Sequence, residues 1–269
     1  MSWLLDPLGY EFMRSALLAA VLVAVACSSI GVYVVFRKMA FIGDALAHTV
    51  LPGLVVAYLY QLSMLGGAVI AGIASALAIG KITAGRTVSE DTAIGITFSG
   101  MFALGILMMS RTGSFRDLSH MLFGNILGVG QIQLYVIAGI AVLIPLALFF
   151  LHKELELTSY DPSHAEVIGL RVDRVRYLLL ILLALTVVGG VIAVGVVMTS
   201  ALIITPAAAA SLVTRRLVPM MLLSAAIGIL SGISGLYLSF YWNVSSGAAI
   251  VLICTGLFAL TAVVERLRR

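Results

Sequence analysis

Nine long apolar runs, separated by short polar connections, fill most of this sequence. A helix that crosses a membrane needs about 20 apolar residues, and 62% of this chain is hydrophobic while only 10% is charged. Strands of a membrane barrel would alternate apolar and polar residues, whereas these runs are apolar on all sides. We therefore predict an all-α, polytopic helical membrane protein forming one transmembrane domain over residues 1–269. The expected spans are 15–36, 42–61, 65–84, 92–109, 131–151, 177–197, 200–214, 218–240 and 246–264.

The seventh run, 200–214, decides whether the chain has eight or nine spans. It is short and contains Pro206, so it is either a full span or a half-helix buried among the others. If all nine runs cross and the N-terminus lies outside, only Arg14, Arg111 and Arg116 of the 16 Lys and Arg residues are outside. Basic residues concentrate on the cytoplasmic side of membranes. This bias favours nine spans, an outer N-terminus and a cytoplasmic C-terminus.

The segment 152–176 is the longest polar stretch and is expected on the cytoplasmic side. Asp161 followed by Pro162 is typical of a helix start, with Asp161 as the N-cap and Pro162 at the first helical position. Gly169 suits the position just after a helix end. The segment is therefore expected to contain a short helix over 162–168.

Asp44 and His48 are the most informative polar residues because ionisable groups inside a span are costly and usually line a substrate path. Their spacing of four places both side chains on one helix face, and Pro52-Gly53 is expected to break the helix beside them. A carboxylate with an imidazole suits Mn, Fe or Zn, and two such pairs across a dimer axis would give four ligands. Alternatively, Asp44 caps the second span near the cytoplasmic surface and His48 is an ordinary packed polar residue.

Other candidate residues carry weaker signals. Asp117 and His120, three residues apart in the expected external loop, would attract a cation at an entrance or belong to a solvated loop. Cys27 and Cys254 lie in apolar runs and form no CxxC pair, so we expect them to be packing residues.

Several motifs are absent from the sequence. It contains no GxxxxGK[ST] phosphate-binding loop, no HExxH and no GxSxG. We therefore expect neither an ATPase site nor a hydrolase site in this chain, and its modest net charge of +4 does not suggest a nucleic-acid partner.

Five stretches in order resemble the permease subunits of bacterial ABC importers for manganese, zinc and iron. They are Phe41-Ile-Gly-Asp-Ala-Leu-Ala-His-Thr-Val-Leu-Pro-Gly53, Glu90-Asp-Thr-Ala-Ile-Gly-Ile-Thr-Phe-Ser99, Leu122-Phe-Gly-Asn-Ile-Leu-Gly128, Tyr160-Asp-Pro162 with Gly169, and Ala201-Leu-Ile-Ile-Thr-Pro-Ala-Ala207. Leu51-Pro52-Gly53, Asp91 to Thr97 and Gly124-Asn125 look more like the manganese members, with zinc and ferrous iron as the alternatives.

The resemblance implies a type II ABC importer permease fold in the bacterial cytoplasmic membrane. The expected partners are a second copy of the chain, a separate ATPase subunit, an extracytoplasmic metal-binding protein and membrane lipid. A divalent metal would be the transported substrate, with no permanently bound cofactor. Asp44 and His48 would belong to the metal path. The helix after Asp161 would dock into the ATPase, with Asp161, Pro162, Ala165 and Gly169 as its coupling residues.

Three other functions fit parts of the sequence. A stand-alone secondary transporter would use Asp44 as a proton or cation site and would need no ATPase. An intramembrane enzyme would use Asp44 and His48 as acid and base and would turn over a substrate without ATP. A structural membrane protein would leave the Asp–His pair unexplained.

Overall fold

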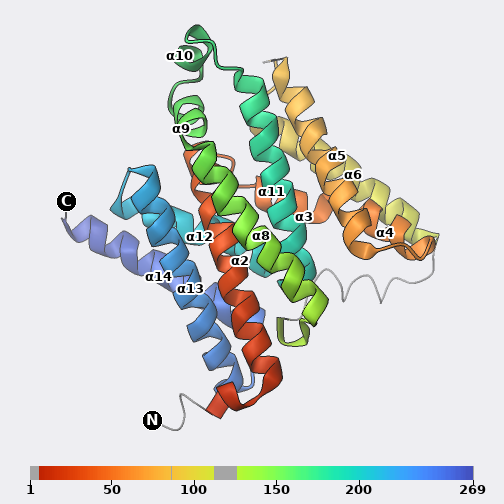
Figure 1. Cartoon of the computed structure of the whole chain (residues 1–269), viewed down its shortest axis with the longest axis vertical. Helices are drawn as coiled ribbons and strands as arrows, with labels where there is room; N and C mark the ends of the chain where they lie inside the picture. Colours follow the sequence, from red (N-terminus) through yellow and green to blue (C-terminus); the bar gives the residue numbers. More distant parts are fainter. Residues whose placement is uncertain (1–5, 86, 112–125, 269) are drawn as a thin grey trace.

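The computed structural model describes residues 6–85, 87–111 and 126–268, and these residues form helices and turns without any strand (Figure 1). Eight helices are long: α2 (Glu11–Phe36), α5 (Met64–Ala84), α6 (Glu90–Ser110), α8 (Gln131–Phe150), α11 (Val172–Val194), α12 (Val196–Val213), α13 (Leu217–Trp242) and α14 (Ser246–Arg268). The others are short: η1 (Asp6–Gly9), α3 (Ile42–Thr49), α4 (Leu51–Leu59), η2 (Ile126–Gly128), α9 (His152–Tyr160) and α10 (Pro162–Val167). The all-α prediction is confirmed.

Nine helical stretches of the described chain are long and apolar enough to cross a membrane. Eight are the long helices, and the ninth is the stretch Ile42–Leu59, in which α3 and α4 follow one another. The prediction of eight or nine spans is thus confirmed at its upper value. The uncertain seventh run begins at Val196 rather than at residue 200, which gives α12 a full 18 residues.

The sixth span begins earlier than expected, at Val172 rather than residue 177. The charged residues Asp173, Arg174 and Arg176 suggested a loop, but they form the first turns of α11. The Arg176 guanidinium lies 3.4 Å from the Glu90 carboxylate of α6 and 3.5 Å from that of Asp173. Such pairing lowers the cost of placing these charges at the membrane end of a span.

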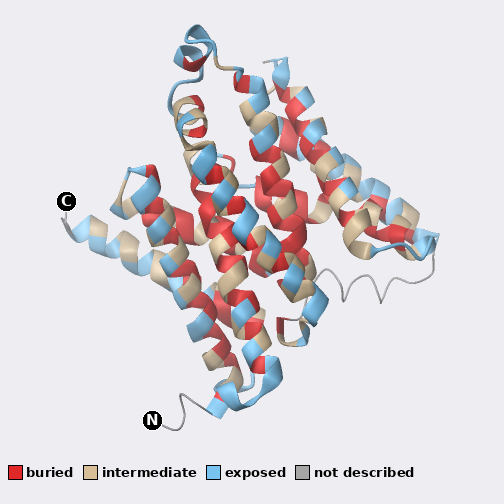
Figure 2. Cartoon of the chain, viewed as in Figure 1, coloured by how far each residue is buried: buried red, intermediate tan, exposed pale blue. Residues whose placement is uncertain are grey.

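α2 and α11 form the centre of the molecule, and 72% of each span is buried, against 17% for α14. Figure 2 shows the buried residues concentrated along these central helices. In Figure 1, α4, α5 and α6 lie on one side of them, and α13 and α14 lie on the other. In lipid there is no hydrophobic driving force for apolar helices to associate. The helices of the bundle therefore depend on close packing, which small residues permit.

Glycine provides this close packing where α2 meets α12. A Cβ at Gly31 would collide with the backbone carbonyl of Ile203. Gly195, with φ at 93°, is the single residue between α11 and α12. Residues with a Cβ rarely adopt this backbone conformation, so glycine at this position allows two buried spans to follow each other directly.

Candidate metal-ion site

α3 carries the two residues that the sequence singled out. Nε2 of His48 lies 3.9 Å from Oδ1 of Asp44, so the prediction that they share a helix face is confirmed. About half of the Asp44 side chain is exposed, whereas 29% of the His48 side chain is. A separation of 3.9 Å exceeds a hydrogen bond. Two donor atoms that each lie about 2.1 Å from one ion are 3.0–3.4 Å apart at angles of about 90–110°, so a small side-chain rotation would let both bind one ion.

Two phenylalanines of α6 hold the His48 ring. The imidazole centroid lies 5.4 Å from the Phe102 ring and 5.9 Å from the Phe98 ring, in edge-on arrangements. Within the described chain, Nδ1 of His48 is buried and has no hydrogen-bond partner. A histidine that binds metal usually donates its second ring nitrogen to an oxygen. In this structure, packing against Phe98 and Phe102 fixes the ring instead and leaves Nε2 on the side of Asp44.

The helix is interrupted directly after the pair. α3 ends at Thr49, Val50 joins the two helices, and α4 begins at Leu51 with Pro52 in its first turn. The break was expected at Pro52-Gly53, so it lies slightly earlier than predicted. In a continuous helix, the N–H of residue 52 would donate to the carbonyl four residues before it, that of His48. Proline has no N–H, so this hydrogen bond cannot form. Proline therefore starts the second helix and ends the first one a turn upstream.

Gly53 fixes the position of α4 by contact with Gly67 of α5. A Cβ on either glycine would collide with the backbone carbonyl of the other. The backbones of α4 and α5 therefore touch at this crossing, and any side chain larger than hydrogen on either glycine would push the two helices apart.

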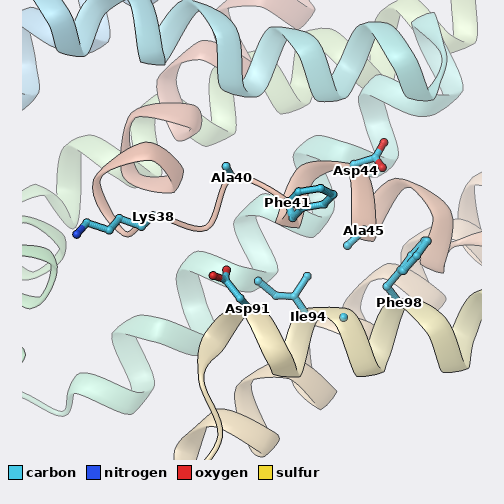
Figure 3. Close-up of a pocket in the computed structure, with 9 residues that line it drawn as sticks. Lys38, Ala40, Phe41, Asp44, Ala45, Asp91, Ile94 and Phe98 are labelled. Atoms are coloured by element: carbon cyan, nitrogen blue, oxygen red, sulfur yellow. The ribbon is translucent and has the colours of Figure 1, made fainter.

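A cavity of about 320 Å³ opens beside Asp44, and Figure 3 shows several of the residues that line it. Its wall includes a second carboxylate, that of Asp91 in the first turn of α6, together with Lys38 and Phe98. In the sequence, Asp91 belongs to a stretch that carries the family resemblance, but it was not predicted as a site residue; an acidic residue in the first turn of a helix is common and stabilises the helix N-terminus. The sequence likewise gave no signal for the contacts of Phe98 and Phe102 with His48.

One chain offers few ligands for an ion. The described residues contain no group of three or more His, Cys, Asp or Glu side chains arranged for a metal, while transition metals in proteins take about four to six ligands. A metal ion bound by this pair would therefore need further ligands from elsewhere. Asp117 and His120, the candidate entrance residues, lie outside the described residues.

The expected short helix of the segment 152–176 is confirmed as α10. Oδ1 of Asp161 accepts a hydrogen bond of 2.9 Å from the backbone N–H of His164, and Pro162 occupies the first helical position. Gly169 follows the helix with φ at 90°, and Ala165 is fully buried. The sequence missed α9, which directly continues α8 after the single residue Leu151. In Figure 1, α9 and α10 extend from the bundle at the end opposite the N-terminus.

The nine membrane-length helical stretches of the described residues, one of them interrupted and carrying a carboxylate–imidazole pair, define a polytopic membrane protein with a candidate cation site. The chain belongs to the ABC 3 transport family, whose model matches residues 9–265. The predicted permease class is thereby confirmed.

Relatives of this chain include both manganese and iron transport proteins. It is 44% identical over 254 residues to "Manganese transport system membrane protein MntC" of Halalkalibacterium halodurans, covering 94% of this chain and 87% of the relative. It is 39% identical to "Probable iron transport system membrane protein" of Haemophilus influenzae, covering 99% and 98%. Among solved structures, "PsaBC from Streptococcus pneumoniae in complex with Fab" matches with a TM-score of 0.84 and 34% identity, covering 97% and 94%.

Proposed function

We propose that this chain is the membrane-spanning subunit of an ATP-driven importer of divalent transition metal ions, with Mn(II) as the cargo. The observation that carries the proposal is the Asp44–His48 pair, held on one face of an interrupted span beside a cavity. One carboxylate oxygen and one imidazole nitrogen suit Mn, Fe and Zn, and the lack of a nearby thiolate disfavours Cu(I). The manganese transport relatives favour Mn(II), with iron and zinc as the alternatives.

The remaining ligands come from a second copy of the chain. Asp44 is half exposed, and the part of α6 that lines the same cavity is open at Gly95, where a Cβ would meet no atom within 4 Å. A two-fold axis next to this face would bring two Asp44 and two His48 side chains to one ion. The two carboxylates would then balance the charge of a divalent cation.

ATP hydrolysis belongs to a separate subunit that docks on α9 and α10, within the coupling segment 152–176. The chain has no phosphate-binding loop, and the tip of this segment exposes two apolar side chains, Val167 and Ile168. Four residues shape this tip. Asp161 caps the N-terminus of α10 and Pro162 begins its first turn, while Ala165 is buried beneath it and Gly169 follows it with a positive φ. These features support a docking role, because exposed apolar residues rimmed by polar ones mark contact surfaces.

The protein lies in the bacterial cytoplasmic membrane with its N-terminus outside and its C-terminus in the cytoplasm. The positive-inside bias supports this orientation. In this orientation, α10 would face an ATPase subunit in the cytoplasm.

Elemental analysis of cells tests the proposal. The chain is expressed together with the ATPase subunit and the binding protein of the same transporter. The wild type is compared with Asp44→Asn and His48→Gln, and membrane insertion is checked for each. Glu11→Gln, at an exposed acidic position in the first turn of α2, is the matched control. We expect manganese to rise with the wild type and the control and to stay at background in both site variants.

Other outcomes separate the parts of the proposal. A rise in zinc or iron instead of manganese would support the importer mechanism but assign a different transported metal. Uptake that persists without the ATPase would indicate a secondary transporter. Normal uptake by both site variants would show that Asp44 and His48 are structural.

A further inference from the structure

A second cavity, of about 220 Å³, lies where three spans reach the same end of the bundle. α2 ends there at Phe36, α6 begins at Glu90 and α11 begins at Val172, while α9 and α10 cover it from outside. Its polar wall consists of Arg37, Lys38, Arg176, Glu90, Thr158 and Ser159. This wall is more basic than that of the cavity beside Asp44, which Lys38 also lines but which contains two carboxylates, those of Asp44 and Asp91.

Arg37 uses only two of its five guanidinium N–H donors in the hydrogen bonds that the structure shows. Its Nε donates to Oγ of Ser159 at 3.1 Å, and one terminal nitrogen donates to Oγ1 of Thr158 at 2.9 Å. Both partners are neutral hydroxyls, and a guanidinium carries five N–H donors in all. Burial lowers the pKa of Arg37, which the nearby Glu90 carboxylate opposes and the Arg176 charge reinforces. The guanidinium nevertheless stays charged, because arginine is not deprotonated in proteins.

The acidic groups near the cavity form their ion pairs with Arg176, although Glu90 is also close enough to act on the pKa of Arg37. Glu90 and Asp173 both lie within 3.5 Å of the Arg176 side chain. Three cations therefore face the cavity against the single lining carboxylate of Glu90, and the second acid, Asp173, is outside the wall. Lys38 also faces the carboxylates of the cavity beside Asp44, whereas the hydrogen bonds of Arg37 all go to neutral hydroxyls. The wall of this cavity therefore carries more positive than negative charge, which favours an anionic occupant.

The position and the apolar part of the wall indicate where that anion comes from. The cavity lies at the ends of membrane spans, the level at which lipid headgroups sit, and Phe36, Pro162 and Val172 complete its lining. Phe36 also packs edge-on against the half-exposed Tyr160, with ring centroids 5.2 Å apart. Basic pockets between helices at the membrane surface are a recognised setting for anionic lipid headgroups.

We propose that this cavity binds the phosphate group of an anionic phospholipid, with Arg37 and Lys38 as the principal ligands and the hydroxyls of Thr158 and Ser159 beside them. The bound lipid would join the end of α2 to α9 and α10. The proposal does not depend on which metal the protein transports, or on whether it transports one.

Native mass spectrometry of the full-length permease in detergent tests the proposal, with dioleoyl phosphatidylglycerol and dioleoyl phosphatidylcholine as lipid probes. The variants are Arg37→Gln and Lys38→Gln. Arg174→Gln, an exposed arginine on α11 outside the cavity, is the control with the same change in charge. Hydrogen bonds between charged groups contribute enough that losing Arg37 or Lys38 should weaken phosphatidylglycerol binding about tenfold. Phosphatidylcholine binding and the control should be unchanged.

Three results would overturn the proposal. The first is equal retention of phosphatidylglycerol by the wild type and both variants. The second is complete displacement of the lipid by millimolar inorganic phosphate, which would assign the cavity to a soluble anion. The third is loss of the ATPase subunit from the Arg37→Gln complex with phosphatidylglycerol binding intact, which would assign Arg37 to an acidic side chain of that subunit. Lys38 is exposed, so Lys38→Gln keeps the test valid if Arg37→Gln does not fold.

Discussion

Gly53 of α4 and Gly67 of α5 face each other so closely that neither has room for a Cβ, because each would meet the carbonyl oxygen of the other. The contact joins the interrupted span, which carries the candidate metal ligands, to the next span of the chain. It is a backbone-to-backbone contact, so side-chain movement cannot relieve an added methyl group.

Gly53→Ala and Gly67→Ala should each destabilise the protein by about 1–3 kcal/mol, the usual cost of overpacking a tight contact. The midpoint of thermal unfolding of the purified permease measures this effect. Gly139→Ala is the control, because a Cβ at Gly139 on α8 meets nothing within 4 Å. Equal midpoints for all three variants would show that the helices separate at little cost.

Phe102→Ala should weaken metal uptake without removing a ligand. The ring lies 5.4 Å from that of His48, and such aromatic contacts contribute about 0.5–1.5 kcal/mol. We expect a several-fold higher metal concentration for half-maximal uptake, because the imidazole loses its fixed orientation. Phe149→Ala, at an exposed phenylalanine of α8, should leave the uptake curve unchanged. An unchanged curve for Phe102→Ala would mean that packing does not orient His48.

Asp91→Asn should reduce metal uptake, but less than Asp44→Asn does. Asp91 lines the same cavity as Asp44, and a carboxylate in a cavity raises the local concentration of cations. The initial rate of manganese uptake, and its dependence on ionic strength, measure the effect. Asp173→Asn is the matched control, since that acidic residue lies at the start of α11 and outside the cavity wall. A rate for Asp91→Asn equal to that of the wild type would show that the carboxylate has no part in the path.

Asp161→Ala should impair retention of the ATPase subunit, whereas Asp161→Ser should preserve it. The alanine variant removes the cap of α10, a loss of about 0.5–2 kcal/mol for such helices, while serine can cap equally well. Co-purification of the ATPase with the tagged permease distinguishes the two variants. If alanine and serine behave alike, the cap does not shape the docking surface.

The sequence predicted the spans well because their signal is local. A run of apolar residues identifies a membrane helix without reference to its neighbours, and the cap at Asp161 with the turn at Gly169 follows from adjacent residues alone. The early start of α11 was missed because Arg176 finds its partner, Glu90, far away in the chain. Only the folded structure brings these two charges together.

The candidate site was predictable in part for the same reason. Asp44 and His48 lie one helical turn apart, so their spacing was sufficient to place them on one face. Asp91, Phe98 and Phe102 belong to another span, and nothing in their own spacing indicates that they approach α3. The cavity near Arg37 depends on four separate segments and left no pattern in the sequence.

The break at Val50 divides one span into two helices that have different neighbours. Downstream, α4 is in backbone contact with α5 through Gly53 and Gly67. At the junction, Pro52 has no N–H to donate to the His48 carbonyl, so this hydrogen bond does not tie α4 to α3. Asp44 and His48 therefore lie on a helix of their own, α3, which packs against α6 and α12. Because both side chains belong to that one short helix, their mutual spacing depends on α3 alone, and the phenylalanines of α6 pack against His48 from outside it.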